Sequence, residues 1–202
     1  MDLQEALKIV EKINPKRMSH ILGVVDQATH LAKRYNVNLY KSQLAAALHD
    51  IAKNMSISDM ETILNTYNPT YLQYSTNVYH GPVGRYLLEN EYNVTDESIL
   101  NAVEFHVTGH PEMDDVLKVV YISDYTERGR THPQVHYCRT LSEINLDVGV
   151  LAVSESILNY LQSKHMDDIH PLSIQTYELF LEKVGEDTYE SIKNHYQRHL
   201  RR

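Results

Sequence analysis

Apolar residues along the chain recur every three to four positions rather than every two, a spacing typical of amphipathic α-helices. Glycine and proline, with seven and six residues, are scarce and fall mostly between the periodic stretches. The pattern therefore predicts an all-α protein. The expected helices cover residues 2–12, 16–35, 56–64, 113–125, 146–162 and 173–202, with a break near Gly185 in the last. Three more are expected: one carries residues 44–51, one has Pro82 in its first turn, and one runs from a cap at residues 95–98 to Gly109.

One connection, residues 65–77, is polar, contains Pro69 and is rich in tyrosine, so we expect a loop with irregular turns. Aromatic rings in such a loop could stack on an adenine base, or they could simply pack the loop against the protein. The tyrosines concerned are Tyr67, Tyr71, Tyr74 and Tyr79.

Length and composition narrow the class of protein. A chain of 202 residues, 42% hydrophobic and 23% charged, fits one globular domain over residues 1–202. The single cysteine, Cys138, excludes an internal disulfide and favours a reducing compartment, the cytoplasm. No stretch is apolar enough to span a bilayer, so we expect no membrane association. The net charge of -8 argues against nucleic-acid binding, and the basic stretch 193–202 is interpreted as a solvated helix end.

The apolar run 44–51 carries a histidine and a carboxylate at its end, His49 and Asp50, followed three residues later by Lys53. Burying imidazole and carboxylate groups is costly unless they are paired, and a metal cation pairs with both. The same argument applies to Asp124, which follows the apolar run 119–122 and needs a cationic partner.

Further histidines occur at the ends of other apolar helices, and each alone could be a helix cap or a satisfied core residue. Together, six nitrogen and oxygen ligands without a thiolate suit iron, manganese or zinc. Six are also enough for two metal ions that share a bridging carboxylate, for which Asp50 is the natural candidate. The candidate ligands are His20, His49, Asp50, His80, His106 and Asp124.

The order of these residues resembles the H…HD…D signature of the HD-domain metal-dependent phosphohydrolases. More specifically, the chain is similar to the bacterial YqeK family over nearly its whole length. One departure is that the family usually shows Ala-Asp-Tyr-Ile-Glu-Pro-x-Arg where this chain has the sequence of residues 123–130. The strings that carry the resemblance are His20-Ile21-Leu22-Gly23-Val24, Ala46-Ala47-Leu48-His49-Asp50-Ile51-Ala52-Lys53, His80-Gly81-Pro82-Val83-Gly84, His106-Val107-Thr108-Gly109 and Ser123-Asp124-Tyr125.

The resemblance implies an all-α HD-domain helical bundle that holds two metal ions, typically iron. It implies symmetrical hydrolysis of diadenosine tetraphosphate and related dinucleoside polyphosphates to two ADP by a metal-activated water. The resemblance assigns the first ion to His20, His49, Asp50 and Asp124, and the second to Asp50, His80 and His106. Among these, we expect Asp50 and His80, together with Lys53, to act in catalysis.

A polyphosphate substrate also needs cationic and hydrogen-bonding groups near the metal ions. Lys53 is the first candidate, although a lysine near a helix end also interacts with the helix dipole. Arg17 and Arg130 are further candidates. Thr108 and Gly109 could offer a hydroxyl and a backbone N–H to phosphate oxygens, or they could mark an ordinary helix end.

Other functions remain open at this point. The same fold could serve a nucleotidase or a phosphohydrolase for guanosine signalling nucleotides, a di-iron oxygenase, or a non-catalytic nucleotide- or RNA-binding module. A complete set of six ligands argues against the binding module, which does not need two metal ions. A homodimer is also compatible with the sequence.

Overall fold

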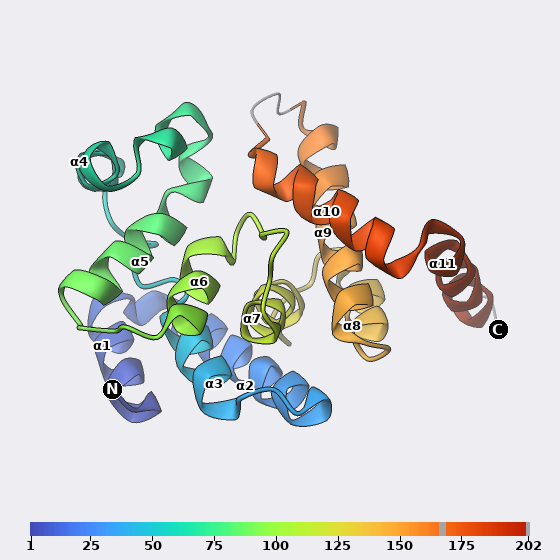
Figure 1. Ribbon diagram of the computed structural model, residues 1–202. Helices are drawn as coiled ribbons and strands as arrows, with labels where there is room; N and C mark the ends of the chain where they lie inside the picture. Colours follow the sequence, from blue (N-terminus) through green and yellow to red (C-terminus); the bar gives the residue numbers. More distant parts are fainter. Residues whose placement is uncertain (166–168, 201–202) are drawn as a thin grey trace.

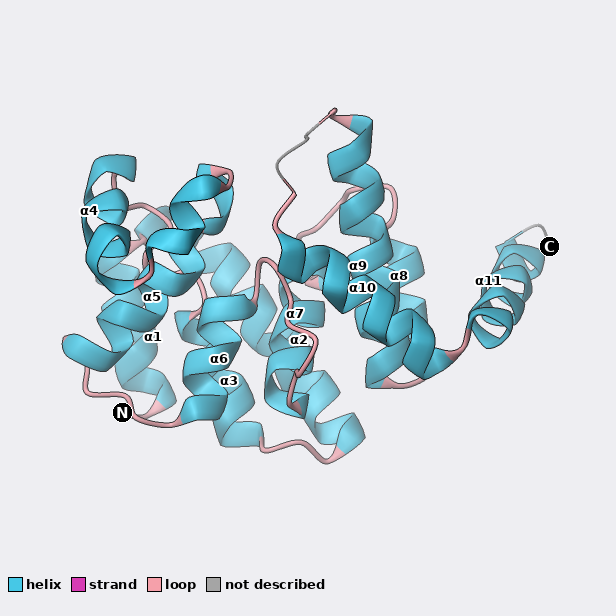
Figure 2. Ribbon diagram, turned by 45° about the horizontal axis from the view of Figure 1, so that its top comes forward, coloured by secondary structure: helices cyan, strands magenta, loops and turns pink. Residues whose placement is uncertain are grey.

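The computed structural model describes residues 1–165 and 169–200, with side chains as far as Tyr196. Within these residues every regular element is a helix, and no strand is present (Figures 1 and 2). This confirms the all-α prediction. The α-helices are α1 Leu3–Ile13, α2 Met18–Tyr35, α3 Leu39–Leu48, α4 Ile57–Tyr67, α5 His80–Asn90, α6 Glu97–Phe105, α7 Asp115–Thr126, α8 Val135–Ser142, α9 Leu146–Ser163, α10 Pro171–Val184 and α11 Glu186–Leu200. The short 3₁₀ helices are η1 Pro15–Arg17, η2 Pro69–Gln73 and η3 Thr76–Val78.

The centre of the fold is formed by α2, α3, α6 and α7, in which α3 contacts the other three and α7 also contacts α2 and α6 (Figure 1). On one side, α1 packs on α3, α5 packs on α6, α4 packs on α5, and η2 packs on α4. On the other side, α8 and α9 contact α7, and α10 packs along α9. Elements from both ends of the chain thus surround the four central helices.

Two groups of buried apolar residues form the core. The larger group includes residues from the first helix to the last, among them Ala6, Val120 and Tyr189. The smaller group lies beneath α4 and η2 and includes Tyr71 and Tyr79, each only 3% exposed. The packing interpretation of these two tyrosines therefore fits the structure better than base stacking.

Helix α3 is built from small residues, and Ala45, Ala46 and Ala47 are completely buried. Small side chains let α2, α6 and α7 approach α3 closely. The prediction that this helix carries His49 and Asp50 was wrong by one turn, because α3 ends at Leu48. The turn that follows is fixed by the buried Asn14, whose Nδ2 donates to the Asp50 carbonyl at 2.8 Å.

Other element boundaries also differ from the prediction. Helix α4 continues to Tyr67, into the expected loop, and η2 and η3 occupy much of the remainder. Helix α5 begins at His80, and Pro82 lies in its first turn as predicted, since a proline there removes no intrahelical hydrogen bond. The short helix α8 was not predicted. It buries Val135, Cys138 and Leu141 at a spacing of three residues.

Several predicted helix ends are confirmed. Ser56 and Asp96 cap the N-termini of α4 and α6 with their side chains. Gly185 separates α10 from α11 at φ 83°, a conformation that favours glycine. Among the described residues, no helix has the length and hydropathy needed to cross a membrane. In the basic stretch 193–202, Lys193 pairs with carboxylates, and the side chains from residue 197 onward lie outside the described residues.

Candidate metal centre

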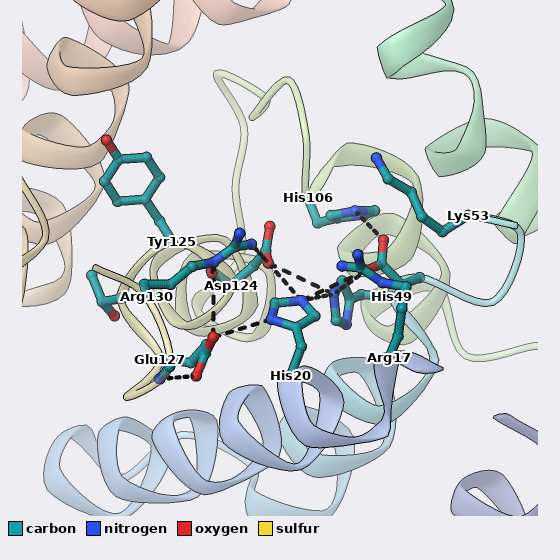
Figure 3. A network of polar contacts seen from close by, with 12 residues as sticks. Arg17, His20, His49, Lys53, His106, Asp124, Tyr125, Glu127 and Arg130 are labelled. Carbon is teal, nitrogen blue, oxygen red and sulfur yellow. Dashed lines mark hydrogen bonds and ion pairs between the residues drawn. The ribbon is translucent and has the colours of Figure 1, made fainter. Parts of the chain in front are cut away.

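The six predicted ligands converge on one place in the fold although they come from five separate segments (Figure 3). One ligand atom per residue lies within 4.8 Å of the others in three overlapping sets, which are His20 with His49 and Asp50, His49 with His106 and Asp124, and Asp50 with His80 and His106. The two oxygens of Asp50 divide the six residues into two groups. His20 comes from α2, His49 and Asp50 from the turn after α3, His80 from the start of α5, His106 from the end of α6 and Asp124 from α7.

The first group of ligands surrounds one carboxylate oxygen of Asp50. His49 Nε2 lies 3.2 Å and His20 Nε2 lies 3.6 Å from Asp50 Oδ2. The two imidazole nitrogens are 3.3 Å apart. Asp124 Oδ1 completes the group at 3.1 Å from His20 Nε2 and 3.8 Å from His49 Nε2.

The second group surrounds the other oxygen of the same carboxylate. His80 Nε2 lies 3.4 Å and His106 Nε2 lies 3.7 Å from Asp50 Oδ1, and the two nitrogens are 3.1 Å apart. Asp50 therefore offers one oxygen to each group, which is the arrangement required of a bridging ligand. Its side chain is only 3% exposed.

The hydrogen bonds of two histidines show that these groups fit cations. His49 Nδ1 donates to the Ala46 carbonyl at 2.7 Å, and His106 Nδ1 donates to the Val103 carbonyl at 2.8 Å. In the neutral imidazoles, Nε2 then carries a lone pair that faces the other ligand atoms. Lone pairs directed at one another across little more than 3 Å repel unless a cation lies between them. The donor set thus fits one metal ion in each group.

The pKa values of the ion-free site follow from burial and these contacts. Burial raises the pKa of Asp50, but the neighbouring charge of His49 and hydrogen bonds from His106, His49 and His80 outweigh it and hold the pKa well below its usual range. Burial lowers the pKa of His49, yet Asp50 and Asp124 leave it raised overall. For His80, burial dominates and lowers the pKa to about 4.

Three cationic side chains flank the ligands. Arg17 pairs with Asp50 Oδ2, Arg130 Nη2 lies 2.6 Å from Asp124 Oδ1, and Lys53 Nζ lies 3.4 Å from both ring nitrogens of His80. Partial burial lowers the pKa of Lys53, because it disfavours the charged ammonium. The side chains of Arg17 and Arg130 are 29% and 36% exposed, so solvent reaches the site from their side.

The remaining phosphate-binding candidates are already engaged within the chain. The Thr108 hydroxyl donates to the Gly109 carbonyl at 2.9 Å, and Thr108 is buried. The Gly109 N–H donates to the Phe105 carbonyl at 2.8 Å, and Gly109 has a φ of 72°. These contacts agree with the alternative that the two residues end a helix.

Sequence reasoning missed several residues that shape the site. Glu127 is buried and its Oε1 lies 3.3 Å from His20 Nδ1, although it was not among the candidate site residues. Arg139 of α8 donates to the backbone carbonyls of Thr126, Glu127 and Arg130 and so holds that turn. The apolar residues of α8 were the available signal for Arg139. For Glu127 the available signal was the family pattern Ala-Asp-Tyr-Ile-Glu-Pro-x-Arg, whose glutamate this chain keeps at position 127.

Comparison with known proteins defines the class of this fold and site. The family profile described as HD domain matches residues 17–129, a range that contains all six candidate ligands. The protein is thus an HD-domain hydrolase. HD-domain hydrolases depend on metal ions, in agreement with the donor set.

Relatives that match over nearly their whole length narrow the class of hydrolase further. The chain is 32% identical to a symmetrical bis(5'-nucleosyl)-tetraphosphatase of Halalkalibacterium halodurans, covering 91% of this chain and 100% of the relative. It is 33% identical to the Bacillus subtilis protein of the same name, covering 88% of this chain and 96% of the relative. The chain belongs to the HD-domain family and, within it, to the YqeK family of these relatives.

A solved structure supports most of the fold. A crystal structure described as a predicted HD superfamily hydrolase involved in NAD metabolism, from Clostridium acetobutylicum, matches with a TM-score of 0.84 and 27% identity. The match covers 91% of this chain and 98% of that protein. Much of the chain outside the matched HD-domain profile therefore also has a counterpart in a relative.

Proposed function

We propose that this protein hydrolyses diadenosine tetraphosphate, and related dinucleoside polyphosphates, symmetrically to two ADP. The central observation is the carboxylate of Asp50, which offers one oxygen to each of two histidine groups in a member of the YqeK family. A small-molecule nucleotide is then the partner, as the names of the relatives indicate for those proteins.

The proposed metal centre holds two ions. His20, His49, Asp50 and Asp124 would hold the first, and Asp50, His80 and His106 the second. We propose iron as the ion, with manganese or zinc as alternatives, because imidazole and carboxylate ligands accept all three. When bound, two such ions neutralise charge on the attacked phosphoryl group and lower the pKa of water that attacks it.

Charge supports a polyphosphate substrate. The ion-free site contains three buried or half-buried carboxylates, Asp50, Asp124 and Glu127, beside three cationic side chains, Arg17, Lys53 and Arg130. These charges balance one another, so two bound ions would make the site strongly positive. A polyanionic ligand is complementary to such a site.

The cationic side chains have distinct roles in this proposal. Arg17 and Arg130 lie on the solvent-exposed side of the ligands, where their guanidinium groups would bind phosphate oxygens of the arriving substrate. Lys53 lies beside His80. It would offset negative charge on the half of the polyphosphate that Arg17 and Arg130 do not bind. Asp50 and His80 would contribute to catalysis through their position at the second ion.

The cellular setting is part of the proposal. A reducing cytoplasm suits a chain whose one cysteine, Cys138, is a buried free thiol. One chain carries all six candidate ligands, so the site needs no second copy. A homodimer stays a prediction.

The test is product analysis with iron-loaded protein under reducing conditions. Diadenosine tetraphosphate should yield ADP as the only nucleotide product, and no phosphate should be released. Release of AMP with ATP would show asymmetric cleavage. Nucleoside with phosphate from mononucleotides, and no ADP from the dinucleotide, would favour the nucleotidase alternative and refute the proposal.

A further inference from the structure

The carboxylate of Glu127 is buried next to Nδ1 of the His20 ring (Figure 3). Glu127 is 3% exposed and follows the last residue of α7. Its Oε1 lies 3.3 Å from His20 Nδ1, and its Oε2 accepts a hydrogen bond from the Gly129 N–H at 2.5 Å. The carboxylate therefore has two hydrogen-bonding partners, both of which can act as donors, and it also forms an ion pair with Arg130, whose Nε lies 3.9 Å from Oε1.

The surrounding backbone is shaped to admit this carboxylate. A Cβ atom added to Gly23 on α2 would overlap Glu127 Oε2, and one added to Gly129 would lie 3.0 Å from both carboxylate oxygens. On the other side, Arg139 donates to the carbonyls of Thr126 and Glu127 and fixes the turn. Two glycines and one arginine thus hold the Glu127 carboxylate against His20.

We propose that Glu127 is a positioning residue that fixes the tautomer and ring orientation of His20. Accepting a hydrogen bond from His20 Nδ1–H leaves the lone pair on Nε2, which faces Asp124 Oδ1 at 3.1 Å and His49 Nε2 at 3.3 Å. A histidine ligand is commonly oriented by a carboxylate in this way. This inference rests on the proposed function, because that function requires a metal ion at His20.

A glutamine at position 127 cannot replace this carboxylate, although its shape is nearly the same. Its amide has one acceptor oxygen, whereas His20 Nδ1–H and the Gly129 N–H require two. If the amide oxygen faces Gly129, the amide NH₂ faces His20 Nδ1 and moves the imidazole proton to Nε2, where it blocks metal binding. If the amide turns over, NH₂ opposes the Gly129 N–H.

The experiment measures zinc binding by chelator competition for the wild-type chain and for Glu127→Gln. We expect the wild-type chain to bind two zinc ions and the variant to bind one of them about 10–100-fold more weakly, with the other unchanged. The ¹⁵N–¹H spectrum of the zinc-loaded wild-type protein should show a His20 Nδ1–H signal, assigned with a His20→Gln variant. That signal should be absent from Glu127→Gln.

Two further variants make the test specific. Glu143→Gln removes the carboxylate from a surface histidine pair, His30 with Glu143 at 2.8 Å, and should leave both zinc affinities unchanged. Gly23→Ala keeps the carboxylate but displaces it, so it should weaken the same zinc site, and it decides the question if Glu127→Gln does not fold.

Zinc affinities in Glu127→Gln and Gly23→Ala within twofold of the wild-type values would overturn the role of Glu127 and leave the proposed function standing. A lower melting temperature with unchanged zinc affinities would likewise reduce Glu127 to a structural residue. A wild-type chain that binds no zinc or iron would refute the proposed function and this inference together.

Discussion

At the scale of single residues, the site depends on the orientation of one carboxylate. Asp50 Oδ2 faces His20 and His49, and Asp50 Oδ1 faces His80 and His106. The sequence predicted these residues as candidate ligands, and the structure brings all of them together. Their binding of metal stays a prediction.

Substitution of individual ligands should separate the two ions. Asp50→Ala should lose both, because each ion depends on one of its oxygens. His80→Ala or His106→Ala should lose mainly the second ion. The number of ions per chain, measured by elemental analysis after anaerobic purification, checks this. Equal numbers in all three variants would contradict the assigned division.

Acidification should release the two ions in a definite order. The pKa of His49 is raised, whereas the pKa of His80 is lowered to about 4, so protons compete for His49 Nε2 at higher pH than for His80 Nε2. We expect the first ion to be lost below about pH 6, near the ordinary histidine pKa, and the second at lower pH. Bound metal is measured after dialysis across this range. Loss of the second ion first, or full retention at pH 5, would contradict the account.

The same shifts carry opposite consequences for the stability of the ion-free fold. Because the pKa of His49 is raised in the folded chain, protonation of His49 stabilises the fold. This stabilisation is fully present at pH values below the pKa of His49 in the unfolded chain, and it is lost as the pH rises through the pKa of His49 in the folded chain. A lowered pKa means that His80 makes the fold less stable as pH falls below about 6.5. Bound metal ions would remove the stabilisation by protonated His49, because they displace the proton from its Nε2.

At the scale of elements, α5 and α6 must approach closely to bring His80 and His106 together. Gly81 makes this possible, because a Cβ atom there would overlap the backbone carbonyl of Glu104. Gly81→Ala should push the helices apart and cost about 1–3 kcal/mol of unfolding free energy, together with the second ion. Denaturant unfolding measures the cost. Asn90→Ala, at the exposed end of α5, is the control, and an equal effect in both variants would contradict the argument.

The elements also show how far sequence patterns reach. Periodicity and caps predicted most helices, and Gly185 correctly marked the break between the last two. Helix α8 was missed because it is short, and α3 was extended one turn too far because its end is set by the distant Asn14. Glu127 was also missed, since its burial arises from packing against α2 that no local pattern records.

At the scale of the whole molecule, the chain was predicted to be one domain over residues 1–202, and this stays a prediction. The larger apolar cluster supports it, because it includes residues from α1 to α11. Urea unfolding followed by circular dichroism and by tyrosine fluorescence should give coincident transitions. Separate midpoints for the two signals would indicate that the C-terminal helices unfold independently.

The central claim is that two metal ions share the carboxylate of Asp50. Anomalous diffraction at the iron edge, from crystals grown anaerobically with iron, tests it most directly. The account predicts two peaks, one contacting Asp50 Oδ2 with His20, His49 and Asp124, and one contacting Asp50 Oδ1 with His80 and His106. A single peak, or two peaks that do not share Asp50, would contradict it.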